Sequence, residues 1–464
     1  MREDEATGRG KGDTANGGAT NGTSSDDAPE PRNARVTRRG LIAVAAASAG
    51  GAILARLPAE AQTPATRPSS PGATTQAPTP PPAAGAFDLA SVPTDPTRAP
   101  GPPTSALGAR SPFETPARAP VGVLSGSSYT PLHQLTGTVT PSDLVFERHH
   151  AGVALIDPAK YELLIHGLVD RPTVFTLDDL RRLPHVSLSC FLECSGNGRG
   201  AFKTPKREMT PQAIDGLTSS GEWTGVPLAV LFHEVGVRRG ASWFRAEGGD
   251  ASRLSRSVPV EKGLEDAMIA FAFNGEPLRP ANGYPARLLL PGYEGNANIK
   301  WVRRIELADG PGMFRDETSK YTDPLANGTA RQFSLVMDAK SIITAPAHPV
   351  RLAPNVWTQI TGIAWTGRGK ITRVDVSTDG GANWLVAELQ EPVMSLAHTR
   401  FRLPWKWDGK PAVLMSRAVD ETGAVQPTLA EFRAKRGAGT DYHFSYIRAW
   451  VVEPDGQVFF GVNV

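Results

Sequence analysis

Two long stretches near the N-terminus contain too few large apolar side chains to build a hydrophobic core. Residues 1–35 are rich in Gly, Asp, Thr and Asn, a composition typical of disordered chain. Residues 62–118 are rich in Pro, Ala and Thr, which predicts an extended linker. Folded structure is therefore expected to begin near Pro120 and to occupy roughly 345 residues, which is enough for two cores.

The segment between these stretches is typical of an export signal. Arg38 and Arg39 precede an apolar run of about 14 residues, and the sequence AEA at 59–61 then gives a small-x-small cleavage pattern. The run is shorter than the ~20 residues that a membrane span needs. We therefore interpret residues 1–61 as a disordered N-terminus plus a twin-arginine signal peptide, which predicts periplasmic export of a folded and often cofactor-loaded protein. A chance basic pair and an uncleaved anchor are the alternatives.

The remaining sequence divides into two units with different periodicity. Residues 119–335 alternate strand-like runs such as YELLIHGLV, SLSCFLEC and ARLLLPG with the helical run TLDDLRRL, whose expected N-cap is Thr176. In residues 336–464 the helical signal fades, and alternating apolar and polar residues surround DGG at 379–381, a hairpin signature. We therefore predict an α+β fold, with a mixed α/β domain followed by a β-sandwich.

The chain contains two cysteines, Cys190 and Cys194, and both lie in the stretch SLSCFLECSGNGRG at 187–200. In a strand, residues four apart are separated by roughly 13 Å, whereas a disulfide needs Cα atoms within about 7 Å. The following CSGNGRG is typical of a turn and would not continue a helix. At least one of the two thiols is therefore expected to be free.

Cys194 lies at the start of this glycine turn, and three interpretations of it remain open. It could be an ordinary buried cysteine, a nucleophile with His149 or His150 as its base, or a thiolate ligand to a metal. A zinc site is disfavoured because the sequence has no second cysteine pair. A c-type haem is excluded because no C-x-x-C-H occurs.

Seven blocks in a fixed order resemble the sulfite oxidase family of molybdenum–pterin enzymes, and within it the molybdenum subunits of bacterial sulfane dehydrogenases. The blocks are FERHHAGV, ECSGNGRG, LTSSGEWTGVPL, AEGGDASRLSRSVPVEKGLEDAMI, NGEPLRPANGYPARLLLPGYEGNANIKWVRR, RDETSKYTDP and RVDVSTDGGANW. They cover nearly all of residues 120–464. The resemblance implies a molybdopterin-binding domain over 119–335 and an Ig-like dimerisation domain over 336–464.

The resemblance also assigns site residues, position by position. Cys194 matches the thiolate ligand to molybdenum, Arg148 and Arg199 match pocket arginines, and Tyr321 matches the active-site tyrosine. The matched cofactor-binding positions are Phe146, His149, His150, Asp250, Asn282, Arg287, Asn298, Ile299 and Lys300. These residue types suit the chemistry, since arginine offers bidentate donors to an oxyanion and a phosphate needs cations and backbone N–H groups.

Several positions depart from the family pattern. His149 stands where the family commonly has Asn, and Gly198 replaces an arginine that is often present. Asn282 occupies the position of a histidine in eukaryotic relatives. The arginine that reaches the pocket from the sandwich aligns with Lys370, with Arg368 two residues earlier, so one of these two is expected to line the pocket.

The resulting functional hypothesis is a periplasmic Mo-molybdopterin enzyme that oxidises sulfite or a carrier-bound sulfane sulfur. No second redox centre is encoded, so we expect a c-type cytochrome as electron acceptor and, as a second partner, a sulfur-carrier protein. A homodimer through the C-terminal domain is also expected. The near-neutral net charge of +2 argues against a nucleic-acid partner.

Four other functions were weighed against this hypothesis. A sulfoxide reductase of the same fold is disfavoured by residues 340–464, because those relatives lack a C-terminal sandwich. A nitrate reductase is disfavoured because no haem or flavin module is present in the sequence. The third is a secreted cysteine hydrolase that uses Cys194, and the fourth is a non-catalytic binding protein, which would leave the first folded unit unexplained.

Overall fold

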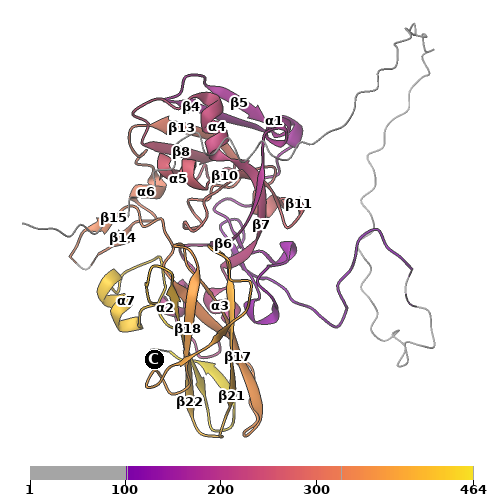
Figure 1. Ribbon diagram of the computed structural model, residues 1–464, viewed down its shortest axis with the longest axis vertical. Helices are drawn as coiled ribbons and strands as arrows, with labels where there is room; N and C mark the ends of the chain where they lie inside the picture. Colours follow the sequence, from indigo (N-terminus) through magenta and orange to yellow (C-terminus); the bar gives the residue numbers. More distant parts are fainter. Residues whose placement is uncertain (1–100, 102, 326, 463–464) are drawn as a thin grey trace, which may run out of the picture. The chain divides into compact units, whose positions relative to one another are not determined.

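The computed structural model describes residues 101, 103–325 and 327–462. The predictions for residues 1–61, and for the linker up to residue 100, lie outside the described residues. The described chain consists of six sheets and short helices, and the predicted α+β class is confirmed (Figure 1). Among these residues, no helix combines the length and the apolar character that a membrane span requires.

The first core forms around a mixed five-stranded sheet in the order β5-β4-β13-β8-β9. Alternation along β4 buries Leu163 and Ile165, while α4 contributes Leu231 and Phe232 to the same core. The strands are β4 (Glu162–Gly167), β5 (Thr173–Thr176), β8 (Trp243–Gly248), β9 (Ser255–Pro259) and β13 (Val302–Ala308), and the helices that pack on them are α1 (Leu177–Arg182), α4 (Leu228–Val235) and α5 (Val260–Glu265).

The start of α1 confirms the predicted N-cap. The Thr176 side chain accepts a hydrogen bond from the Asp179 N–H, and the Asp179 carboxylate accepts one from the Thr176 N–H. This capping box satisfies two backbone donors that a helix start leaves free.

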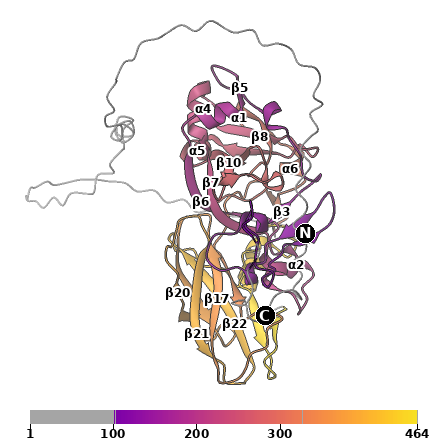
Figure 2. The ribbon, with the colours of Figure 1, turned by 90° about the vertical axis from the view of Figure 1, so that its right-hand side faces the viewer.

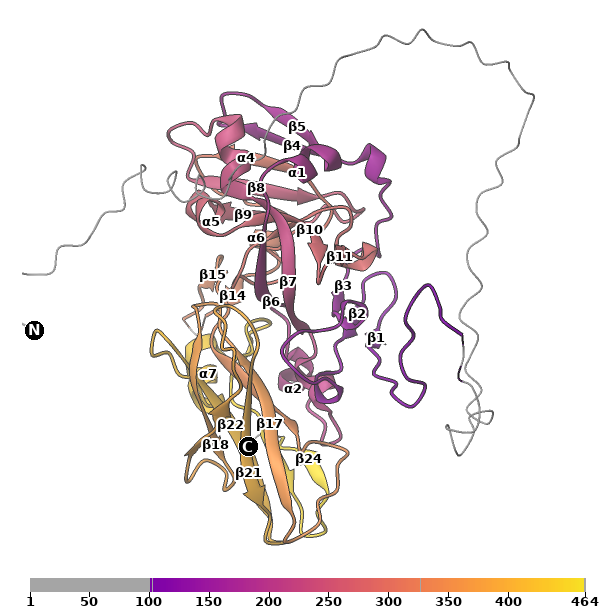
Figure 3. The same ribbon diagram turned by 45° about the vertical axis from the view of Figure 1, so that its right-hand side comes forward.

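A second sheet contains β6, the strand that ends one residue before Cys194. It has the order β11-β10-β7-β6, and β12 pairs with β10. Figure 3 shows β6 and β7 as long neighbouring strands. Cys190 and Trp223 are buried in the core that adjoins these strands. Both cysteines are free, which agrees with the prediction that at least one would be. The strands are β6 (Val186–Glu193), β7 (Thr218–Pro227), β10 (Met268–Phe273), β11 (Glu276–Pro277) and β12 (Arg287–Leu289).

Shorter elements connect these sheets and surround the site. They are β1 (Ala119–Val121), β2 (Ser127–Tyr129), η3 (Leu132–Gln134), η4 (Ser142–Leu144), β3 (Glu147–Arg148), η5 (Pro158–Lys160), α2 (Arg199–Lys203), α3 (Pro211–Asp215), η6 (Pro280–Asn282), α6 (Arg315–Thr318), β14 (Asp323–Pro324) and β15 (Ala330–Arg331).

The C-terminal part is a β-sandwich, which confirms the second half of the fold prediction (Figure 2). Its two sheets have the orders β16-β17-β21-β20 and β19-β18-β22-β23-β24, and Ile342, Val374, Leu414 and Trp450 are buried in its core. The hairpin predicted around residues 379–381 joins β18 to β19. The elements are β16 (Lys340–Ala345), β17 (Trp357–Trp365), β18 (Ile371–Ser377), β19 (Leu385–Val386), β20 (Glu388–Leu389), β21 (Thr399–Lys406), β22 (Ala412–Asp420), α7 (Leu429–Arg436), β23 (Ala449–Val452) and β24 (Val458–Phe460).

Buried ion pairs connect the sandwich to the first domain. Lys340 Nζ lies 2.6 Å from Asp215 Oδ1 and 3.0 Å from Glu193 Oε1. Arg448 also pairs with Asp215, at 3.1 Å, and the Trp365 Nε1–H donates to Glu193 Oε2 at 2.6 Å. All five side chains are at most 2% exposed. Because a buried charge is costly without its partner, these contacts make each domain depend on the other.

Candidate active site

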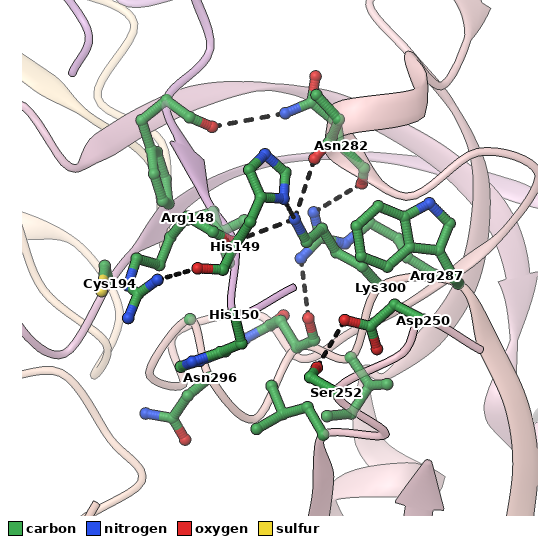
Figure 4. A pocket seen from close by; sticks show the side chains of 18 of the residues that line it. Arg148, His149, His150, Cys194, Asp250, Ser252, Asn282, Arg287, Asn296 and Lys300 are labelled. Atoms are coloured by element: carbon green, nitrogen blue, oxygen red, sulfur yellow. Dashed lines mark hydrogen bonds between the residues drawn. The ribbon is translucent and has the colours of Figure 1, made fainter. Parts of the chain in front are cut away.

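A cavity with an empty volume of about 720 Å³, open solvent at its mouth included, lies where β3, the end of β6 and the turns after β8 and β12 meet (Figure 4). This size falls in the range of small-molecule sites, roughly 300–1,000 Å³. It is lined by Phe146, Arg148, His149, His150, Leu192, Cys194, Asp250, Ser252, Leu254, Ala281, Asn282, Arg287, Gly295, Asn296, Asn298, Ile299, Lys300, Trp301 and Tyr321. Twelve of the thirteen predicted site residues therefore share one cavity, and Arg199 is the exception.

Cys194 enters the cavity because β6 ends at Glu193 and the chain turns immediately. The Cys194 N–H donates to the Leu217 carbonyl at 3.0 Å, and the Asn197 N–H donates to the Cys194 carbonyl at 2.9 Å. Burial raises the pKa of the Cys194 thiol, while the Gly196 N–H and Arg148 offset part of that rise. A thiol held in this way becomes a thiolate most readily when a bound cation replaces its proton.

Two glycines are required by the close packing around this turn. Gly198 has φ +98°, and a Cβ there would lie 2.5 Å from Arg448 Nη2. A side chain at position 198 would therefore collide with the guanidinium that pairs with Asp215, so glycine fits this position in the present fold. A Cβ on Gly295 would lie 2.7 Å from the Glu193 carbonyl oxygen, so the cavity wall can approach Cys194 only without a side chain.

Arg148 is held by the small sheet at the N-terminal edge of the domain. It lies in β3, where it pairs with Ser127 of β2. Its guanidinium donates to the carbonyl oxygens of Gly126 and His149, and Figure 4 shows it directed toward Cys194. The arrangement places a fixed positive charge beside the thiol, where an anion would bind.

His150 and Tyr321 meet across the cavity, with His150 Nε2 2.8 Å from the Tyr321 hydroxyl. Burial and the neighbouring Arg148 lower the pKa of His150 to about 4. Burial and the Cys194 thiolate raise the pKa of Tyr321 above its usual range. Both groups are therefore neutral near pH 7, and the phenol keeps a proton that it can share or donate.

The Lys300 ammonium group makes its hydrogen bonds within the protein. Its Nζ donates to the carbonyls of Arg148 and Ala281, each at 3.1 Å, and to His149 Nδ1 at 2.8 Å. An ammonium has three protons, and these contacts use all three, so Lys300 holds the Arg148 backbone rather than donating to a ligand. Burial and Arg287 lower the pKa of Lys300 well below its usual value.

His149, which stands where the family commonly has Asn, has a hydrogen-bond partner for each of its two ring nitrogens. Its Nε2 lies 3.0 Å from Glu147 Oε2, and its ring stacks on Trp301 with the centroids 6.0 Å apart. Burial lowers the pKa of His149. The imidazole therefore bridges Lys300 to Glu147, a contact that asparagine is too short to make in the same way.

The remaining predicted cofactor-binding residues differ in whether their polar side-chain atoms already have hydrogen-bond partners within the protein. Arg287 donates to the carbonyls of Asn282 and Asn298 at 2.9 Å, while its buried Nε has no hydrogen-bond partner. Asp250 accepts from Ser252 at 2.5 Å. The Asn298 side chain is consumed by the turn, since its Oδ1 accepts from the Leu290 N–H at 2.6 Å.

Three predicted cations lie outside the cavity wall. The Arg199 guanidinium donates to the Asp441 carbonyl at 2.7 Å, and its side chain is 46% exposed. Arg368 pairs with Asp338 at 2.9 Å, and Lys370 is likewise absent from the cavity wall. The expectation that Arg368 or Lys370 lines the pocket is therefore wrong for this structure, because Asp338 holds the first and the sandwich does not bring the second to the cavity.

Sequence reasoning missed several cavity residues. They are Leu192, Ser252, Leu254, Ala281, Gly295, Asn296 and Trp301. Asn296 is polar and lies two residues before Asn298 in EGNANIKW, so its position next to predicted residues was the available signal. Its Nδ2–H group donates to Ser195 Oγ at 2.9 Å and to Glu294 Oε2 at 2.7 Å.

The donor set fits a metal that is carried by an organic cofactor. Among the residues that the structure describes, no cluster of three or more His, Cys, Asp or Glu side chains could hold a metal alone. The cavity instead offers one thiol, the cations Arg148, Arg287 and Lys300, and a single carboxylate, Asp250. One soft ligand plus a surplus of positive charge suits a metal dithiolene that ends in a phosphate.

Comparison with known proteins agrees with this geometry. Residues 150–313 match the family model of the oxidoreductase molybdopterin-binding domain, and residues 331–448 match that of the Mo-co oxidoreductase dimerisation domain. The crystal structure of the sulfane dehydrogenase SoxCD from Paracoccus pantotrophus is 44% identical, with a TM-score of 0.76 over 79% of this chain and 96% of that chain. The chain belongs to the sulfite oxidase family.

More distant members of the sulfite oxidase family share the same region. Nitrate reductase [NADH] 2 from Phaseolus vulgaris is 32% identical over 60% of this chain and 35% of its own length. The mitochondrial sulfite oxidase of Drosophila melanogaster is 31% identical over 60% of this chain and 50% of its own length. The chain thus spans about a third to a half of these relatives. Mo-molybdopterin is the cofactor of this family, which confirms the cofactor prediction and sets aside the cysteine hydrolase.

Proposed function

We propose that the chain is the molybdenum subunit of a periplasmic dehydrogenase that oxidises sulfite or carrier-bound sulfane sulfur and passes electrons to a c-type cytochrome. The observation that carries this proposal is the 44% identity to the sulfane dehydrogenase SoxCD over nearly all of that chain. The nitrate reductases are less similar, at 30–32% identity over about a third of their length.

The cavity residues support a role for each part of the site. Mo-molybdopterin, when bound, supplies a two-electron redox centre. Cys194 would ligate the metal, and Arg287 with Lys300 would supply the charge that balances the cofactor. Arg148 would bind the anionic substrate beside the thiol. Tyr321, with His150, would hold one proton at the phenol oxygen, 2.8 Å from the imidazole.

Elemental analysis combined with a dye-reduction assay tests the proposal. The purified protein should contain close to one molybdenum per chain and should reduce a one-electron dye when sulfite or a protein-bound persulfide is added. Nitrate should not reoxidise the reduced enzyme. A metal-free protein, or one that turns over nitrate but neither sulfur compound, would refute the assignment.

The acceptor and the location are tested separately. Reduction of a cytochrome c by enzyme and substrate should slow as ionic strength rises, because the docking relies on local charge. Direct reduction of NAD would argue against a cytochrome. Replacement of Arg38 and Arg39 by Lys should leave cofactor-loaded precursor in the cytoplasm, and normal periplasmic accumulation of that variant would exclude the twin-arginine route.

The family model over residues 331–448 supports a homodimer through the sandwich. The interface would be isologous, with the same surface used on both chains. Sedimentation at micromolar concentration should give the mass of two chains, and a monomer under those conditions would contradict this part of the proposal.

A further inference from the structure

One short segment of the C-terminal domain makes five contacts with residues in and around the active site. This segment, residues 436–443, begins at the last residue of α7 and is called the α7 arm below. Its contacts are Arg436 with Asp323, the Asp441 carbonyl with Arg199, Tyr442 with Tyr321, the His443 N–H with the Ser195 carbonyl, and the His443 ring with Glu294. The arm thus contacts Tyr321, which lines the cavity, from outside the cavity wall, whereas neither Arg368 nor Lys370 lines the cavity.

Tyr321 needs such support because its backbone is strained. Its φ is +53°, a left-handed conformation that costs a residue with a side chain roughly 1–2 kcal/mol. Such strain persists where surrounding contacts hold the backbone, and the chain is anchored on both sides of Tyr321.

On the N-terminal side, the anchor is Glu317 in α6. Its buried carboxylate accepts hydrogen bonds from the Ser257 N–H and from the Phe314 N–H, the latter at 3.3 Å. Arg256 Nε lies 3.8 Å from Glu317 Oε1, and the Arg256 guanidinium also lies 5.3 Å from the centre of the Tyr321 ring. Both charged side chains are fully buried.

On the C-terminal side, the anchor comes from the α7 arm. Asp323, two residues after Tyr321, is 1% exposed and accepts a hydrogen bond from Arg436 Nη1 at 2.8 Å. Arg436 Nη2 donates to Asp338 at 2.9 Å, so the guanidinium bridges two carboxylates. Burial raises the pKa of Asp338, but Arg436 and Lys435 outweigh that effect and hold it at about 2.

The arm also supports the Tyr321 ring itself. The rings of Tyr321 and Tyr442 lie 5.1 Å apart at an angle of 39°. The Arg199 guanidinium lies 5.1 Å from the Tyr442 ring centre and donates to the carbonyl of the preceding residue, Asp441. Tyr442 therefore connects Tyr321 to Arg199, which the family resemblance assigned to the pocket but which lies outside the cavity wall.

We propose that Arg436 and Tyr442 are positioning residues, through which the C-terminal domain holds the Tyr321 hydroxyl against His150 for the reaction. The functional half of this inference, the effect on turnover, rests on the proposed function. The structural half, the anchoring of the chain around Tyr321, does not. Neither residue lines the cavity, so their effect on turnover passes through Tyr321.

Hydrogen–deuterium exchange of the full-length holoprotein tests the structural half. In Arg436→Gln, peptides covering residues 314–323 should exchange at least about tenfold faster than in the unaltered chain, because the arm no longer anchors them. Lys435→Gln is the matched control, since it removes one positive charge from an exposed neighbouring position of α7. Equal exchange of these peptides in both variants would overturn the inference, whether or not the enzyme oxidises a sulfur compound.

A double-mutant cycle tests the functional half and does not require Arg436 to be changed. Tyr442→Ala should lower kcat by about tenfold with KM within about twofold, and Tyr442→Phe, which keeps the ring, should recover most of that loss. In a Tyr321→Phe background, Tyr442→Ala should lower kcat by less than about twofold more, because the two changes remove one interaction. Additive losses would show that Tyr442 does not act through the Tyr321 hydroxyl, and they would overturn the proposal.

Discussion

The Tyr321 hydroxyl lies 2.8 Å from Nε2 of a histidine, His150, that carries no charge near neutral pH. Burial and Arg148 lower the pKa of that histidine to about 4. The pair therefore keeps a neutral hydrogen bond at neutral pH. Its proton belongs to the phenol, because burial also raises the pKa of Tyr321.

Tyr321→Phe should lower kcat by roughly 10²-fold, because it removes the only group at this position that can share a proton. The free energy of unfolding should change by less than about 1 kcal/mol, since the ring and its packing remain. Steady-state kinetics and urea unfolding check the two parts. Tyr293→Phe is the control, because that half-buried tyrosine does not line the cavity; an equal loss of kcat there would contradict the assignment.

Cys194→Ser should abolish turnover and molybdenum retention while leaving the fold largely intact. Cys190→Ala should keep most of the activity, because Cys190 is buried within β6 and its thiol, with a pKa that burial raises to about 12, is inert. Metal content and dye reduction measure both effects. If Cys190→Ala is the inactive variant, the roles of the two cysteines are reversed.

Lys340→Ala should destabilise the protein by about 3–5 kcal/mol, because it leaves the buried Glu193 without its cation and weakens the pairing of Asp215. Differential scanning calorimetry or urea unfolding measures the change. Lys410→Ala is the control, since Lys410 is 81% exposed and its pair with Asp408 is open to solvent. Equal stability of the two variants would show that the buried pairs do not join the domains.

Acid should unfold the protein partly through Glu294. Burial raises the pKa of this carboxyl, but Arg256 and a hydrogen bond from His443 hold it at about 2, below the 4.5 of an exposed glutamate. The unfolded chain therefore binds more protons between these values, so the stabilisation is complete above pH 4.5 and is lost as pH falls toward 2. The loss amounts to about 3 kcal/mol for this group.

Urea unfolding at a series of pH values checks this dependence. Glu294→Gln should be less stable at pH 7 and should show a shallower decline below pH 4.5 than the unaltered chain. Glu208→Gln, which removes an exposed carboxylate, should follow the unaltered chain. A decline of the same steepness in the Glu294 variant would assign the acid sensitivity to other carboxyls.

Local sequence patterns predicted the elements that local forces determine. The capping box at Thr176 and the hairpin around residues 379–381 depend on residues three or four apart, so their signals lie within one short window. Cys194, Arg148 and Tyr321 were brought to one site by the family resemblance, because no periodicity relates segments so far apart in the chain.

The features that the sequence did not predict depend on contacts between distant segments. Arg436 meets Asp323 across 113 residues, and nothing in the composition of α7 distinguishes Arg436 from its exposed neighbours. The tight space at Gly198 could not be predicted either, because Arg448, which limits it, lies 250 residues later in the chain and meets it only in the folded protein. Alignment with the family likewise placed Lys370 near the pocket, whereas Lys370 does not line the cavity in the described chain.

The buried pairs between the two domains also set an order of events in time. Glu193 can pair with Lys340 only after a further 147 residues have been synthesised. Asp215 can pair with Arg448 only after a further 233 residues. Before Lys340 and Arg448 have been synthesised, the carboxylates of Glu193 and Asp215 have no buried cation to pair with. The Cys194 turn then lacks the ion pairs that lie next to it in the folded protein. We therefore expect a cofactor that requires this turn to bind only after most of the chain has been translated.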